Sequence, residues 1–168
     1  MLALVLFVLP FLSVSCDAPG GYGRMQPGGT TTYNGLDLMT GSTPSVDDDR
    51  LRPEAAQQPD ELPAQPLLAL AAVAIVAAIA IPFMSASRRR LAAVVAAVGA
   101  ALLVIGMLVA RATLVDRVAE QATLPFPAGK SAGDYVKVGI GFWIATALTI
   151  IGSALGAIGS RASPVNSP

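Results

Sequence analysis

The chain has 168 residues, of which 54% are hydrophobic and only 13% are charged, about half the charged share of a typical soluble domain. Its 11 basic and 11 acidic residues cancel, and no basic stretch resembles a nucleic-acid footprint. One cysteine and no histidine exclude an intramolecular disulfide, His/Cys metal or haem sites and catalytic dyads that need histidine. We therefore expect a non-enzymatic membrane protein without a cofactor, a metal or a nucleic-acid partner.

The first segment, residues 1–15, reads MLALVLFVLPFLSVS. Its apolar run is shorter than the roughly 20 residues that a transmembrane helix needs. Two interpretations stay open. The segment is either a secretory signal that is removed, or part of a first transmembrane helix.

The end of this segment, Leu12-Ser13-Val14-Ser15-Cys16, resembles a bacterial lipoprotein lipobox. The resemblance implies that Cys16 is lipidated and becomes the mature N-terminus. Ser13 departs from the pattern, which prefers Leu there, and no basic residue precedes the apolar run. The alternative is an unmodified Cys16 at the outer end of a first helix.

A second resemblance joins LPFLSVSC, the stretch Thr32-Tyr33-Asn34-Gly35-Leu36-Asp37-Leu38 and a later Gly141-Phe142-Trp143. This combination is similar to uncharacterised bacterial membrane proteins with about four helices, in which a Cys and a Thr-Gly-Leu-type segment follow the first helix. The match covers about 40 residues of the chain. It implies a membrane location and no particular activity.

Residues 16–66 are rich in Gly, Pro and acids, and we expect a largely irregular extracytoplasmic segment. Within it, Thr30–Tyr33 and Leu36–Met39 flank Asn34-Gly35, a pattern that predicts a β-hairpin. The run Asp47-Asp48-Asp49 offers poor convergence for a cation, so a solvated acidic patch is favoured.

Three long apolar segments follow, and no charged residue lies inside any of them. They predict an all-α membrane protein with three transmembrane helices, or four counting residues 1–15. The helices are expected at residues 67–84, 91–110 and 138–158. A basic link, 85–90, joins the first two, a loop at 111–137 with a possible helix extension precedes the third, and a tail at 159–168 follows it.

Arg88, Arg89 and Arg90 lie between two of these helices. The positive-inside rule places them in the cytoplasm, which puts residues 16–66 and 111–137 outside a bacterial plasma membrane. The outer loop itself holds four cations, which oppose this orientation, but they are more widely spaced: Arg111, Arg117, Lys130 and Lys137.

The last apolar segment carries small residues at helical spacing: Thr146, Thr149, Gly152, Ser153 and Gly156. Small residues let transmembrane helices approach closely. The stripe therefore predicts packing, either against the other helices of this chain or against other subunits or a second copy. The absence of ionisable groups inside the segments disfavours a pump.

The favoured function is an accessory or scaffold subunit that acts through helix packing and its extracytoplasmic segment, with the lipid bilayer and other membrane-protein subunits as partners. Two alternatives remain. One is a lipid-anchored envelope protein that binds an external ligand, and the other is a small oligomeric channel or transport subunit.

Overall fold

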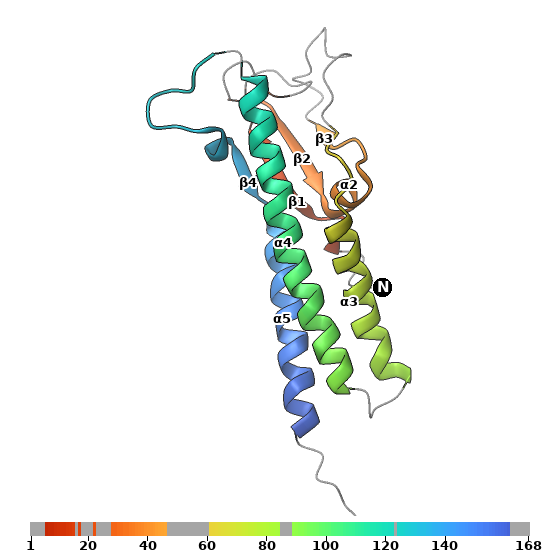
Figure 1. The fold of residues 1–168 in the computed structure, drawn as a ribbon. Coiled ribbons are helices and arrows are strands. Elements are labelled where there is room, and N and C mark those ends of the chain that lie inside the picture. The colour runs from red at the N-terminus through yellow and green to blue at the C-terminus, as the bar shows by residue number, and fades with distance from the viewer. Residues whose placement is uncertain are drawn as a thin grey trace, which may run out of the picture.

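A computed structural model describes residues 6–15, 17, 22, 28–46, 61–84, 89–122 and 124–161, without the side chains of 82–84, 89 and 155–161. A small sheet lies at one end of three long helices. The longest of these helices packs with the other two and also extends alongside the sheet (Figure 1). The strands are β1 (Pro10–Ser15), β2 (Thr30–Asn34), β3 (Ser45–Val46) and β4 (Val136–Val138). The helices are α2 (Gly35–Thr40), α3 (Pro66–Met84), α4 (Arg89–Gln121) and α5 (Ile140–Arg161), with a 3-10 turn, η4 (Ala132–Tyr135), before β4.

The sheet is antiparallel, with strand order β3-β2-β1-β4. β1 lies inside it, because Leu12 faces Tyr33 of β2 on one side and Val138 of β4 on the other. Phe11, Leu12 and Val14 are fully buried. The segment at the start of the chain is therefore an interior strand whose side chains form part of the core.

The expected all-α fold with three or four transmembrane helices is wrong. The described chain contains a four-stranded sheet, and among its helices only α4 is long and apolar enough to cross a membrane. α3 and α5 contain shorter apolar sections, Pro66–Ile81 and Ile140–Ala154. Residues 10–15 are β1 and not the end of a helix, because this stretch pairs with a neighbouring strand on each side, and its Phe11 and Val14 are residue types that favour strands.

The described parts of residues 16–66 are also more ordered than expected, and the predicted hairpin is wrong. Thr30–Asn34 pairs with β1, and Gly35–Thr40 forms helix α2. Asn34 is the N-cap of that helix: its side chain accepts from the Asp37 N–H at 2.9 Å, and Asp37 accepts from the Asn34 N–H at 3.0 Å. This reciprocal capping box satisfies two helix-end donors, so Asn34-Gly35 starts a helix instead of closing a turn.

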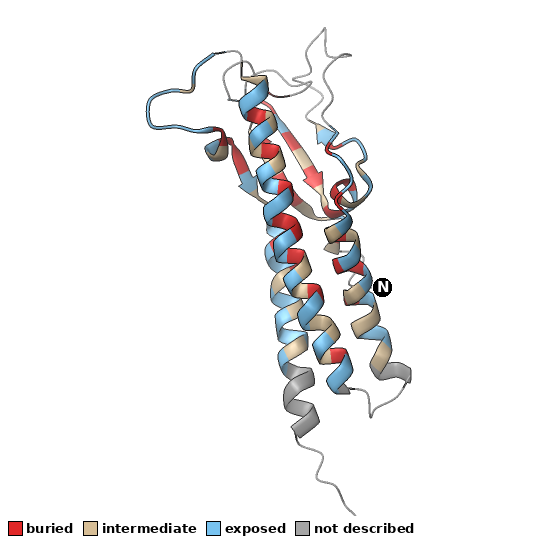
Figure 2. Cartoon of the chain, viewed as in Figure 1, coloured by how far each residue is buried: buried red, intermediate tan, exposed pale blue. Residues whose placement is uncertain are grey.

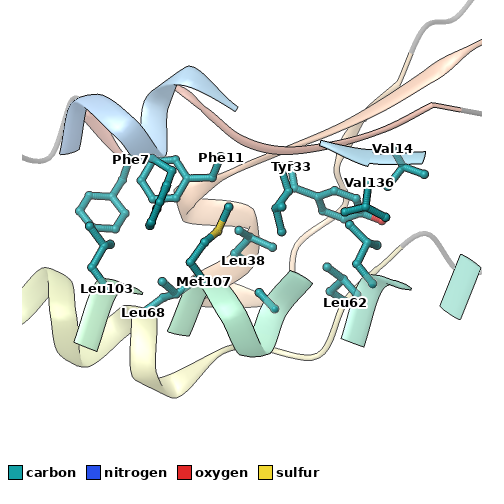
Figure 3. Close-up of a cluster of buried hydrophobic side chains, with 14 of the residues drawn as sticks. Phe7, Phe11, Val14, Tyr33, Leu38, Leu62, Leu68, Leu103, Met107 and Val136 are labelled. Atoms are coloured by element: carbon teal, nitrogen blue, oxygen red, sulfur yellow. The ribbon is translucent and has the colours of Figure 1, made fainter. Parts of the chain in front are cut away.

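The core lies between the sheet and the helices (Figure 2). Phe7 stacks on Phe11 with ring centroids 5.4 Å apart, and Phe11 meets Phe142 of α5 edge-on at 6.4 Å. Figure 3 shows the Phe7–Phe11 pair between α5 and the Leu103 and Leu68 side chains of α4 and α3. The residues that precede β1 thus join the sheet to the helices.

α4 packs against both α3 and α5. Two of its glycines allow close approach to α3, since a Cβ at Gly99 would lie 3.3 Å from Ala74 and Ile75, and one at Gly106 would lie 3.0 Å from Leu68. Small residues at such crossings are typical of helices that pack in lipid. Only 28% of the most apolar stretch of α4 is buried inside the molecule, whereas the core helix of a soluble protein is mostly buried.

Candidate membrane-facing surface

Large apolar side chains are exposed around the three long helices, and together they form a surface that we call the apolar belt. Isolated exposed apolar residues are ordinary, but a continuous set of this size marks a site of interaction with lipid or protein. On α3 the belt comprises Leu70, Val73, Val76 and Ile79; on α4 it comprises Leu91, Val94, Val98, Val104, Ile105, Leu108 and Val109; on α5 it comprises Ile140, Trp143, Ile144, Leu148, Ile150 and Ile151.

Arginines bound the belt on α4. Residues 91–110 hold no charged side chain, and Arg90 and Arg111 flank them. At about 1.5 Å per residue this section is about 30 Å long, which equals the thickness of a bilayer's hydrocarbon core. α4 alone therefore has the length and the charge pattern of a membrane span.

The belt also ends at one level on the neighbouring helices. Gly106 of α4 lies against Leu67 and Leu68 in the first turn of α3, which follows the exposed Glu61 by only a few residues. A guanidinium nitrogen of Arg111 lies 3.9 Å from the Cβ position at Gly133, shortly before the exposed Lys137. On α4 and at the start of α5, exposed charged residues thus give way to exposed apolar ones near Arg111, and α3 begins beside Gly106, five residues before Arg111 in the chain.

Beyond Arg111, α4 continues to Gln121, about 16 Å further. On this part Leu114 and Val118 are buried in the core, and Arg117 donates a hydrogen bond to the carbonyl oxygen of Glu61. The polar end of α4 therefore shares one core with the four strands and α2. We call these five elements the sheet platform.

The sheet platform also holds both ends of an acidic segment. Thr43 donates to a carboxylate oxygen of Glu61 at 3.1 Å, and the Gln65 N–H donates to the carbonyl of Leu38 at 2.8 Å. Gly41 has φ +72°, and a Cβ there would lie 3.0 Å from the backbone of Ala64. The described residues on either side of positions 47–60, a stretch with five acids and two arginines, are thus held close together.

Two further polar groups stabilise the loops of this end. Asp37, which is 9% exposed, also accepts from Ser42 at 3.0 Å. The Asp134 carboxylate accepts from the Ser131 N–H at 2.7 Å and from its hydroxyl at 3.0 Å. The backbone hydrogen bond, then the hydroxyl, and to a smaller extent Lys130, lower the pKa of Asp134 below its ordinary value.

Several residues singled out from the sequence lie outside the described part of the chain: Cys16, Arg88 and the run Asp47-Asp48-Asp49. Arg89 begins α4, and Arg90 is exposed next to it. Ser15, directly before Cys16, is the last residue of β1. Cleavage between them would remove an interior strand of the sheet, so lipidation of a new N-terminus conflicts with this fold.

The small-residue stripe lies on α5, but its members do not share one environment. Thr149 donates to the Ala145 carbonyl at 2.6 Å, and Ser153 donates to the Thr149 carbonyl at 2.7 Å, as hydroxyls in helices commonly do. The Thr146 hydroxyl is buried and has no hydrogen-bond partner. A Cβ at Gly152 would meet nothing within 4 Å, and Gly156 lies in the last part of the same helix.

Among the residues that the structure describes, no three His, Cys, Asp or Glu side chains come close enough together to hold a metal ion. Compared with known proteins, the chain matches no protein-family profile, no curated protein and no solved structure. The two resemblances drawn from the sequence therefore remain predictions. The arrangement at hand is an apolar belt around α4 with a polar platform at one end.

Sequence reasoning missed the residues that build the platform. The contact between Thr43 and Glu61 joins residues far apart in the chain, so no local sequence pattern predicts it. Asn34 and Asp37 do carry a signal, because an N-cap residue followed three positions later by an acid is a capping-box pattern. The Asn34-Gly35 pair is also typical of hairpin turns, and this second pattern led to the wrong prediction.

Proposed function

We propose that this chain is a non-enzymatic integral membrane protein that serves as an accessory or scaffold subunit. In this proposal α4 crosses the bilayer, the apolar belt on all three helices faces lipid, and the sheet platform stands in water at one membrane surface. The 28% burial of the α4 stretch and its length between Arg90 and Arg111 support this placement. Arg88, Arg89 and Arg90 then mark the cytoplasmic side of a bacterial plasma membrane.

The observation that carries the scaffold role is the joining of Thr43 to Glu61 at the base of the acidic segment. A linker between two separated bodies would have its ends apart. Here the described residues that flank the acidic segment 47–60 are held together, and a surface segment whose ends are adjacent is frequently functional. Its net charge of −3 favours a partner with a basic surface.

A direct test replaces residues 47–60 by an uncharged Gly/Ser sequence of the same length. The control keeps the composition of residues 47–60 but scrambles their order, which preserves the charge. All chains are cross-linked in native membranes and then sized in mild detergent.

We expect the wild type and the scrambled control to run as one larger complex, and the Gly/Ser variant to lose the partner while its sheet still unfolds at the wild-type temperature. A wild-type chain that runs only as a monomer without a partner contradicts the scaffold role. So does a Gly/Ser variant that keeps the complex.

The lipid-anchored alternative needs cleavage before Cys16 and hence the loss of β1, so the fold disfavours it. No observation on the described residues favours a channel over a scaffold.

A further inference from the structure

Three cations gather around η4 at the level where the apolar belt ends. The guanidinium of Arg111 lies beside Gly133, and the Lys130 ammonium lies 5.7 Å from the centroid of the Tyr135 ring. Lys137 follows on β4 and is exposed, as are Arg111 and Lys130. The group therefore combines one helix end, one turn and one strand.

The three cations outnumber the acid that lies among them on η4. Asp134 is the one acid on η4, and its carboxylate is already held by the Ser131 N–H and hydroxyl. Within the described part of the chain, no ion pair is formed by Arg111, Lys130 or Lys137. The cluster thus keeps a net positive charge that a partner can neutralise.

The position of the cluster suggests the partner. Between Lys137 on β4 and Trp143 at the start of α5, the exposed residues change from charged to apolar within six positions, through Ile140. Lysine and arginine above apolar and aromatic residues are typical of the layer where lipid headgroups meet acyl chains. Each cation that lies near an anionic bilayer surface raises the protein's affinity for that surface by up to about fivefold.

We propose that Arg111, Lys130 and Lys137 bind the phosphate groups of anionic phospholipids at the membrane surface. This inference rests on the membrane placement proposed above and adds a preference for one class of lipid.

The chain contains its own reporter, because Trp143 is its single tryptophan and is 62% exposed on the first turns of α5. The full chain is reconstituted in phosphatidylcholine bilayers that contain, at equal mole fraction, either brominated phosphatidylglycerol or brominated phosphatidylcholine. Bromine on the acyl chains quenches Trp143 only when that lipid lies against it.

We expect several-fold tighter association of the anionic lipid, and a decrease of this preference when salt is raised from low to high concentration, since salt screens exposed charges. The triple variant Arg111→Gln, Lys130→Gln, Lys137→Gln should bring the ratio to about one. Arg90→Gln, which removes an exposed cation about 30 Å away at the other end of the belt on α4, should leave the ratio unchanged.

The outcomes separate the two proposals. If neither brominated lipid quenches Trp143, the membrane placement is wrong. If both quench equally in the wild type at low salt, the placement stands and the headgroup preference is wrong. A conservative variant, Lys130→Arg with Lys137→Arg, should keep the preference, and its loss there would contradict a charge-based role.

Discussion

The turn between β4 and α5 shows how closely single residues determine this fold. The Gly139 N–H donates to the Phe11 carbonyl at 2.7 Å, and a Cβ at Gly139 would collide with the carbonyl group of Pro10. Because the obstacle is backbone, a neighbouring side chain cannot rotate to relieve the clash. Gly139 therefore fixes the distance between β1 and the start of α5.

Replacing Gly139 by Ala should destabilise the protein by about 1–3 kcal/mol, as overpacking of a filled interior does. Gly152→Ala is the matched control, since its new methyl group would meet open space and should gain up to about 1 kcal/mol of helix propensity. Denaturant unfolding in mild detergent measures both. Equal effects of the two substitutions would show that the β1–α5 contact is not formed.

Asp134 makes a residue-scale prediction about pH. Its folded-state pKa is lowered by the Ser131 N–H and hydroxyl, so its contribution to stability is complete above the ordinary pKa and is lost as pH falls through the lowered value. Ser131→Ala removes the hydroxyl and leaves the N–H. The carboxyl pKa, followed by NMR titration, should therefore rise part of the way toward its ordinary value. An unchanged pKa would mean that the hydroxyl bond is absent in solution.

At the scale of elements, β1 is the piece on which the sheet depends. Leu12 is fully buried between β2 and β4, whereas Val8, four positions earlier, is 59% exposed. Removing Leu12 from the core leaves a cavity among strands on both sides.

Leu12→Ala should cost about 2–5 kcal/mol of unfolding free energy. Val8→Ala should cost less than about 1 kcal/mol, because few buried contacts are lost. Thermal unfolding followed by near-ultraviolet circular dichroism would measure the difference. If the order were reversed, residues 10–15 would not form an interior strand.

The same element predicts how the chain is processed. Since Phe11, Leu12 and Val14 are fully buried, residues 10–15 should stay in the folded protein. Mass spectrometry of protein from native membranes should find a peptide that runs through Ser15 into Cys16. A mature N-terminus at Cys16 would contradict the sheet as described.

The sequence predicted the long apolar helices well and the sheet poorly. Residues 91–110 are uncharged throughout. This local pattern predicts an apolar helix without any knowledge of the segments that pack against it. β1 is different, because its strand pattern follows an apolar run that is typical of signals and helices, and only its pairing with Thr30–Asn34 and Val136–Val138 reveals it. At the candidate site, the arginines at each end of the belt were visible, but the joining of Thr43 to Glu61 depends on the fold.

The whole molecule divides into an apolar length and a polar end along one helix. α4 carries the belt between Leu91 and Val109, and the sheet lies alongside the other end of this helix (Figure 1). A protein that stood wholly in water would expose the belt at a large cost, because each buried CH₂ is worth about 0.8 kcal/mol. The proposed membrane placement would cover the belt with lipid and avoid this cost.

Two residues test this division most directly, because their side chains are almost equally exposed and lie on opposite sides of the inferred boundary. Val73 of α3 is 66% exposed and Leu124, after α4, is 64% exposed. Each is replaced by Cys in a Cys16→Ser chain. Labelling by a water-soluble maleimide is followed in native membrane fragments, which the reagent reaches from both sides. We predict rapid labelling at residue 124 and almost none at residue 73 until detergent or denaturant is added. Equal labelling at both positions in intact membranes would contradict the account.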